Sequence, residues 1–153
     1  MQLTTAMLCD YAEVREGLLF IVAGPITVLW RQEFPAMLGL PLALVVEGAP
    51  EEFVGLPHEV QVVVTHGNAG PVGEARLAFQ IAEKNVAHLE PGERINLPLV
   101  MLTHEAVLPE PGIYTLIVRL NGGEAFGQPE LTLALRASLP PAGGPAGPGQ
   151  AGG

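Results

Sequence analysis

Apolar and polar residues alternate one for one along several short segments of this chain, and this alternation constrains the fold more than any other feature. Every second residue from Leu131 to Leu135 is leucine, and the same period of two runs from Tyr114 to Leu120. Residues 59–65 and 74–81 repeat the pattern. A period of two sends alternate side chains to opposite faces of a β-strand. The chain is therefore expected to contain four half-buried strands.

Further segments are predicted to be buried or partly buried strands: residues 2–10, 18–23, 26–31 and 42–47. Residues 95–102 form another, which Pro98 restricts to an edge or a bulge because proline has no N–H to donate. Glycines in residues 13–17 and 121–123 predict hairpin turns. Residues 50–53 begin with proline followed by two acidic residues, which favours one short helical turn.

Strands of this length, separated by turns and without alternating helices, predict an all-β fold. We expect a two-sheet antiparallel β-sandwich, Ig-like or C2-like, with about 8 strands. A closed barrel is the alternative.

The chain has 153 residues, which suits one globular domain. Ten of the last fourteen residues are glycine or proline, a composition that cannot supply a packed core. We therefore predict a β-sandwich domain over residues 1–138 and a disordered tail over residues 139–153.

Charge and cysteine content limit the binding partners and the cellular compartment to be expected. Lys and Arg number 7 and Asp and Glu number 16, so the net charge is −9 and the surface should repel nucleic acid and anionic membranes. The single Cys9 cannot form an internal disulfide and, with apolar neighbours, is predicted to be a buried thiol in a reducing compartment. The first ten residues carry no basic residue and no long apolar run, so a cytoplasmic location is expected.

No familiar catalytic pattern occurs in the sequence. The only serine, Ser138, borders the predicted tail and lies outside any G-x-S-x-G motif. Cys9 has no base close to it in the predicted strand. We therefore expect a protein that is not an enzyme and needs no cofactor.

Four histidines are the candidate metal ligands. His58 and His66 flank one predicted strand, so about 26 Å separates them and they cannot share an ion. His88 and His104 could meet at one end of the sandwich, close to acidic residues, although their spacing matches no metal motif. A small-ligand or metal site at His88 and His104 is therefore an alternative to plain solvated loop histidines.

A cluster of large apolar residues lies between two predicted strands. Trp30, Phe34, Met37 and Leu38, with Leu40, fall within eleven residues and cannot all point inward from one short connection. The segment is either a lid on the core or an interface whose anchors are the first four. The leading hypothesis is a non-catalytic module that binds protein, as a homo-oligomer or as an accessory or scaffold subunit.

Two regions resemble a known family. Residues 8–12, followed by residues 17–24 and a tryptophan, resemble small bacterial proteins grouped as a domain of unknown function. The run Pro111-Gly112-Ile113-Tyr114 is similar to a strand entry common to that family and to many Ig-like and C2-like sandwiches. The resemblance implies an Ig-like β-sandwich from a bacterium, with no established activity and no catalytic residue to transfer.

Overall fold

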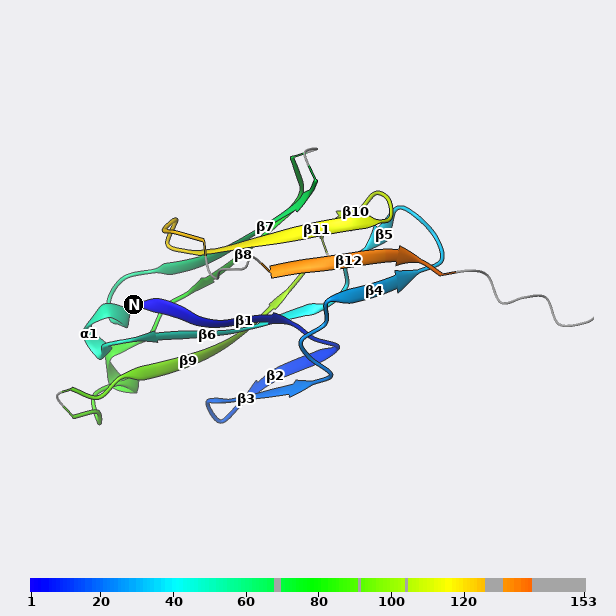
Figure 1. The fold of residues 1–153 in the computed structure, drawn as a ribbon. Coiled ribbons are helices and arrows are strands. Elements are labelled where there is room, and N and C mark those ends of the chain that lie inside the picture. The colour runs from blue at the N-terminus through cyan, green and yellow to red at the C-terminus, as the bar shows by residue number, and fades with distance from the viewer. Residues whose placement is uncertain (68–69, 91, 104, 126–130, 139–153) are drawn as a thin grey trace, which may run out of the picture.

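The computed structural model describes residues 1–67, 70–90, 92–103, 105–125 and 131–138, and these residues form twelve strands and two short helices (Figure 1). The elements in chain order are β1 (Gln2–Leu8), β2 (Tyr11–Arg15), β3 (Leu18–Val22), β4 (Val28–Arg31), β5 (Ala36–Met37), β6 (Pro41–Gly48), α1 (Pro50–Phe53), β7 (His58–His66), β8 (Pro71–Phe79), the 3-10 helix η1 (Glu83–Asn85), β9 (Ile95–Leu102), β10 (Val107–Leu108), β11 (Gly112–Leu120) and β12 (Leu131–Ala137). The predicted tail, residues 139–153, lies outside the described residues.

Two sheets form the layers of a sandwich. Strands β4, β12, β11, β7 and β8 form a five-stranded sheet in that order, and β1, β6 and β9 form a three-stranded sheet. Figure 1 shows the five-stranded sheet above the three-stranded one. Neighbouring strands pair antiparallel except β4 and β12, which pair parallel. The predicted all-β sandwich is confirmed.

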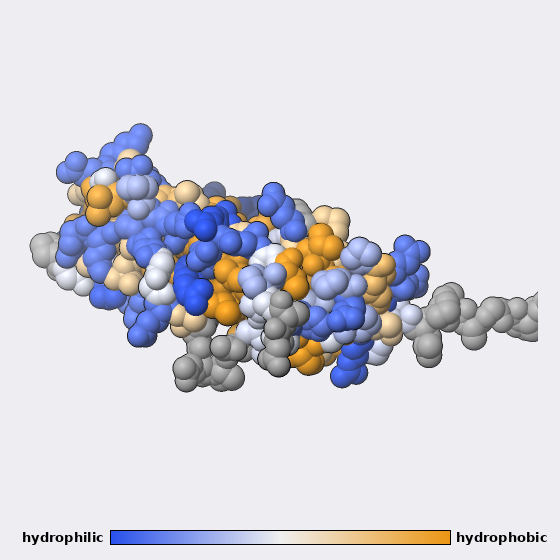
Figure 2. Space-filling view, turned by 90° about the horizontal axis from the view of Figure 1, so that it is seen from above, coloured by the Kyte–Doolittle hydropathy of each residue, from blue (hydrophilic) through white to orange (hydrophobic). Residues whose placement is uncertain are grey.

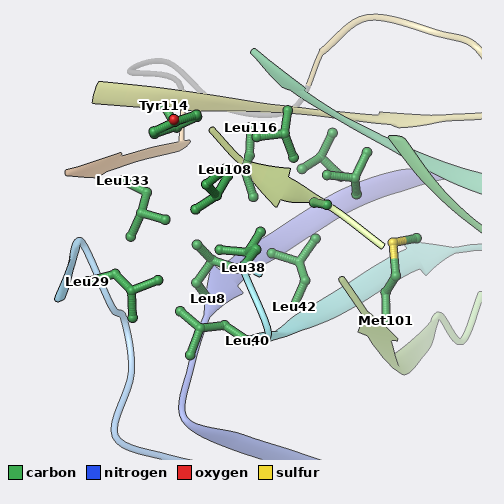
Figure 3. Packing of buried hydrophobic residues seen from close by; sticks show 14 of the residues in the cluster. Leu8, Leu29, Leu38, Leu40, Leu42, Met101, Leu108, Tyr114, Leu116 and Leu133 are labelled. Carbon is green, nitrogen blue, oxygen red and sulfur yellow. The ribbon is translucent and has the colours of Figure 1, made fainter. Parts of the chain in front are cut away.

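The core lies between the sheets, as the alternation predicts. Tyr114, Leu116 and Val118 of β11 are buried, and so are Leu133 and Leu135 of β12. Figure 3 shows Tyr114, Leu116 and Leu133 facing leucines of the opposite layer and of the β5–β6 connection. All four segments with a strict period of two form strands, and Pro98 lies in an edge strand, β9, as predicted.

The expectation of about eight strands is too low for two reasons. The two-residue strands β5 and β10 pair with each other and are too short to predict. The strand predicted over residues 2–10 also divides, because β1 ends at Leu8 and the separate strand β2 begins at Tyr11. The Cys9 N–H still donates to Pro41 of β6 (3.1 Å), whereas the Asp10 N–H donates to Val22 of β3 (3.2 Å), so the chain leaves the three-stranded sheet after Cys9.

The first hairpin joins β2 to β3. Residues 13–15, expected in the turn, belong to β2, so the turn consists of Glu16 and Gly17, with φ of 51° and 76°. Positive φ at both turn residues is the I′ geometry, which matches the twist of a two-residue hairpin. Figure 1 shows this hairpin below the three-stranded sheet, on the side away from the five-stranded sheet.

Residues 50–53 form the predicted helical turn. Glu52 accepts a hydrogen bond from the backbone N–H of Ala49 (2.7 Å), and Phe53 is buried. Within the described residues, no helix has the length and apolar character needed to cross a membrane.

Candidate protein-contact surface

The four predicted anchors do not share one surface. Trp30 and Met37 are 54% and 56% exposed, whereas Leu38 is completely buried in the core. Phe34 is half-buried and packs against the core. The prediction that all four contact a partner is therefore wrong for Leu38, and only a minor part of Phe34 is available for contact.

The difference in exposure between Met37 and Leu38 follows from local backbone geometry. Ala36, Leu38 and Leu40 are buried, while Met37 and Gly39 between them are exposed, so residues 36–40 alternate as a strand does. Pairing of β5 with β10 and a hydrogen bond from the Leu38 N–H to Ala106 O (2.9 Å) hold this orientation. Residues 36–40 thus cover the core with their buried side chains, and they expose Met37 on the surface.

Trp30 and Met37 border a shallow depression of about 700 Å³ at one end of the sandwich. The guanidinium of Arg136 lies over the Trp30 ring, 5.5 Å from its centroid, an arrangement that attracts a cation to an aromatic face. Arg31 donates to the backbone oxygen of Leu38 (3.2 Å). Two arginines therefore give this apolar end a positive border on an otherwise acidic chain.

Apolar residues also reach the outer face of the five-stranded sheet. Val28 and Trp30 in β4 and Ile113 in β11 are exposed there. Figure 2 looks down on this sheet and shows hydrophobic residues, in orange, interrupting a hydrophilic surface.

The β2–β3 hairpin has a second apolar face that the sequence analysis did not predict. Leu18, Phe20 and Val22 of β3 are 62%, 47% and 55% exposed and, because they alternate, point to one side. Leu19 and Ile21 point to the other side and are partly buried where the hairpin contacts β6 and β9. The strand expected over residues 18–23 is therefore present and partly buried, and its second face is exposed.

Strand β2 contributes a polar border to that outward face. Its residues Tyr11, Glu13 and Arg15 lie opposite Val22, Phe20 and Leu18. Glu13 forms an ion pair with Arg15 (2.9 Å) and accepts a hydrogen bond from the Tyr11 hydroxyl, which raises the pKa of that phenol. The charges are thus paired within β2, and the apolar stripe, which we call the β3 stripe (Leu18, Phe20, Val22), lies on the open side of the hairpin.

The three histidines in the described part of the chain lie in separate surroundings. His58 and His66 are the two ends of β7, as predicted. His58 is buried between Phe53 and Phe79, with ring centroids 6.2 and 5.3 Å away, so the expectation of a solvated loop histidine is wrong for it. Its Nδ1 accepts from the Asn121 amide (3.1 Å), whose oxygen is held by the Glu59 N–H (3.0 Å).

His88 is exposed beside an open depression of about 450 Å³ between η1 and β9. Ile81, Val86, Leu89, Ile95 and Leu97 line it together with Arg94. His104 lies outside the described residues. Within the described ranges, no group of three His, Cys, Asp or Glu residues could hold a metal ion.

The run Pro111-Gly112-Ile113-Tyr114 forms a packed corner. The Tyr114 hydroxyl donates to the backbone oxygen of Glu110 (2.6 Å), and the Tyr114 ring stacks on that of His66, with centroids 4.4 Å apart. A Cβ on Gly112 would lie 2.3 Å from His66 Nε2, so the position requires glycine. His66 is therefore also packed into the fold and is not a solvated loop residue.

Residues 4–133 match the family of unknown function DUF6941. The chain belongs to this family. No curated protein and no solved structure matches it. The resemblance to a domain of unknown function is thus confirmed, and the match to DUF6941 covers every strand except the first residues of β1 and the end of β12.

In this DUF6941 chain, β3 was predicted as a strand, but its exposed face was not identified because every residue of β3 is apolar. Leu-Leu-Phe-Ile-Val contains no polar residue to mark the solvent face. A signal was present in β2, where Glu13 and Arg15 alternate with apolar residues and identify the side that faces water.

Proposed function

We propose that this domain is a non-catalytic protein-interaction module that uses the β3 stripe as its main contact. The observation that carries the proposal is three large aliphatic or aromatic side chains in a row, each about half exposed, on one face of a projecting hairpin. Single exposed apolar residues are ordinary, whereas contiguous ones mark interaction sites. Covering the remaining exposed area of each would contribute about 1 kcal/mol.

The Trp30–Met37 end of the sandwich supports the same proposal as a second contact area. An exposed tryptophan bordered by arginines has the composition of an interface anchor. The acidic net charge of −9 supports protein as the partner in preference to nucleic acid or an anionic membrane.

The proposed absence of catalysis is supported by the chemistry of Cys9. Its thiol is buried and donates only to the Pro41 carbonyl (3.6 Å), and burial raises its pKa. A thiol with a raised pKa is a poor nucleophile at neutral pH. A free, buried cysteine also supports a reducing location, which we propose to be the bacterial cytoplasm.

We also propose that the sandwich is Ig-like. Two layers of antiparallel strands, β12-β11-β7-β8 opposite β1-β6-β9, support that arrangement. A second support is the Tyr114 hydroxyl bonded four residues upstream at the start of β11, which has the form of an Ig tyrosine corner.

The interaction proposal is tested by photo-crosslinking in the native cell. A photoreactive amino acid replaces Leu18, and a matched control replaces Leu56, which is equally exposed (62% and 64%) but far from the hairpin in sequence. We expect covalent adducts from position 18 and few from position 56. Equal or absent adduct formation at position 18 would contradict the proposal.

The depression beside His88 favours a second candidate function, binding of a small ligand. Five aliphatic side chains with a histidine and an arginine suit an aliphatic chain that ends in a carboxylate. Calorimetric titration with octanoate tests it, with Arg94→Gln as the variant. If octanoate binds the unaltered chain and not the variant, the candidate is supported. If the unaltered chain gives no heat of binding, the candidate is contradicted.

The metal-binding version of this candidate is tested by elemental analysis of untagged protein. A content below about 0.1 metal ion per chain would eliminate it.

A further inference from the structure

We propose that the open edge of β3, beside the β3 stripe, pairs antiparallel with the β3 strand of a second copy, so that the two hairpins form one four-stranded sheet. This inference rests on the proposed function, because it names the partner for the same hairpin.

The first argument is that β3 has an open and unprotected edge. In the described part of the chain β3 pairs only with β2. Natural edge strands are protected from further pairing by charge, proline or a bulge. The other open strands longer than two residues have such features: Arg31 in β4, Glu74 and Arg76 in β8, Pro98 in β9, Glu13 and Arg15 in β2, and a register shift between Leu3 and Thr5 in β1. Strand β3, Leu-Leu-Phe-Ile-Val, has none of them.

The second argument is the direction of the backbone groups. Arg15 and Leu18 flank a two-residue turn and are paired in register, so they exchange both hydrogen bonds, and every second pair after them does the same. Phe20 therefore directs its N–H and C=O toward β2, whereas Leu19 and Ile21 direct theirs to the open edge. These two residues offer two donors and two acceptors to an incoming strand.

The third argument is that β3 is complementary to itself. A two-fold axis beside Phe20 puts Leu19 opposite Ile21 of the second copy, which satisfies all four outward groups. Phe20 then lies opposite Phe20 of the second copy in a pair without direct hydrogen bonds, where side chains approach most closely. The two β3 stripes become one apolar surface, and cross-strand aromatic pairs of this kind are favourable.

The fourth argument is that charge repulsion between two acidic copies is weak at the β3 edge. Each copy carries −9, yet β3 has no charged residue, and Glu13 is paired with Arg15 in its own strand. In the joined sheet the two β2 strands lie outermost, three strand spacings or about 14 Å apart. That separation exceeds the screening length of about 8 Å at physiological salt, so the acidic copies can approach at this edge.

The fifth argument concerns strength. Two five-residue strands bury well under the about 1,200 Å² of a stable interface. The dimer is therefore weak and depends on concentration, so the measurement must cover a wide range.

The test is sedimentation velocity on the full chain over a hundredfold range of concentration. The variants are Phe20→Lys and Phe20→Glu, alone and mixed, and the control is Ile113→Lys, at an equally outward position in the five-stranded sheet. We expect the unaltered chain and the control to dimerise with concentration. Each Phe20 variant alone should shift the dissociation constant at least tenfold toward monomer, because like charges then face each other.

Mixing the two Phe20 variants should restore a dimer, since lysine then faces glutamate across the axis. Recovery on mixing also shows that the single variants remain folded. A monomeric unaltered chain at all concentrations, an unaffected dimer in Phe20→Lys, or no recovery on mixing would each overturn the inference.

The two proposals fail differently. Crosslinked adducts from position 18 at twice the mass of the chain support self-pairing. Adducts of another mass retain the interaction function and overturn self-pairing. No adducts overturn both.

Discussion

At the scale of single residues, the strongest constraint is the close packing of His66, Gly112 and Tyr114. The His66 ring occupies the volume that a side chain at position 112 would need and stacks on Tyr114. The Tyr114 hydroxyl in turn fixes the backbone before β11. Three residues from two strands thus set the start of β11 against the end of β7.

Gly112→Ala is expected to lower the free energy of unfolding by about 1–3 kcal/mol, because the new methyl group overlaps the imidazole. The same change in a His66→Ala background should cost much less, since the ring is gone. Urea denaturation of the four proteins measures the coupling. If Gly112→Ala lowered the free energy of unfolding equally with and without the His66 ring, overlap with that ring would not be the cause.

The raised pKa of the buried Cys9 thiol predicts that the protein loses stability at alkaline pH. Burial raises its pKa above the ordinary 9.0, so above that pH the unfolded chain releases a proton that the folded chain retains. Stability conferred by the protonated thiol is complete below pH 9.0 and falls as pH rises, by at most about 1.4 kcal/mol per pH unit. Cys9→Ala should flatten the pH dependence of the urea midpoint between about pH 8 and pH 10. Tyr114, whose pKa burial also raises, contributes at higher pH in both proteins. An unchanged slope in Cys9→Ala would refute this role.

At the scale of elements, the same alternation produces both the core and the exposed surface. In residues 36–40 it buries Leu38 and exposes Met37, and in β3 it exposes Phe20 while Leu19 faces the three-stranded sheet. Neighbouring apolar residues can therefore have opposite roles, one in stability and one in contact.

Leu38→Ala should destabilise the fold by about 2–5 kcal/mol, because it leaves a cavity in the core. Met37→Ala, one position away, should change stability by less than about 0.5 kcal/mol because its side chain is largely in water. Thermal and urea unfolding of the two variants measure the difference. Similar costs for both would mean that residue 37 is also part of the core.

The sequence predicted strands in both kinds of segment, but it identified the buried face only where the two faces differ in polarity. Leu131–Leu135 has threonine and alanine between leucines, so its buried face is evident. Strand β3 and residues 34–40 are apolar on both faces, and only tertiary contacts decide which face is buried. For that reason Trp30 and Met37 were correctly expected at the surface within a cluster whose other members, Leu38 and Phe34, belong to the core. His58 was misplaced because the aromatic rings of Phe53 in α1 and Phe79 in β8 enclose it, a contact that the sequence pattern does not show.

At the scale of the whole molecule, an acidic sandwich carries exposed apolar residues on a separate hairpin and at one end. The hairpin lies outside the two packed layers (Figure 1), so a change in its outward face need not disturb the core.

This separation predicts the salt dependence of self-association. Two copies at −9 repel each other, and the proposed contact contains no ion pair across the strands. Raising the salt concentration from about 20 to 500 mM shortens the screening length and should tighten the dimer several-fold. Sedimentation at the two salt concentrations measures this, with the Ile113→Lys variant as control. A dimer that dissociates in high salt would instead indicate contacts between charges.

The parallel pairing of β4 with β12 also has a consequence for how the protein is made. Ala134 pairs with Val28, which precedes it by 106 positions. At a synthesis rate of about 5–20 residues per second, β4 emerges and then waits about 5–20 s for its partner. During translation the five-stranded sheet therefore cannot close until β12, the last described strand, has been made.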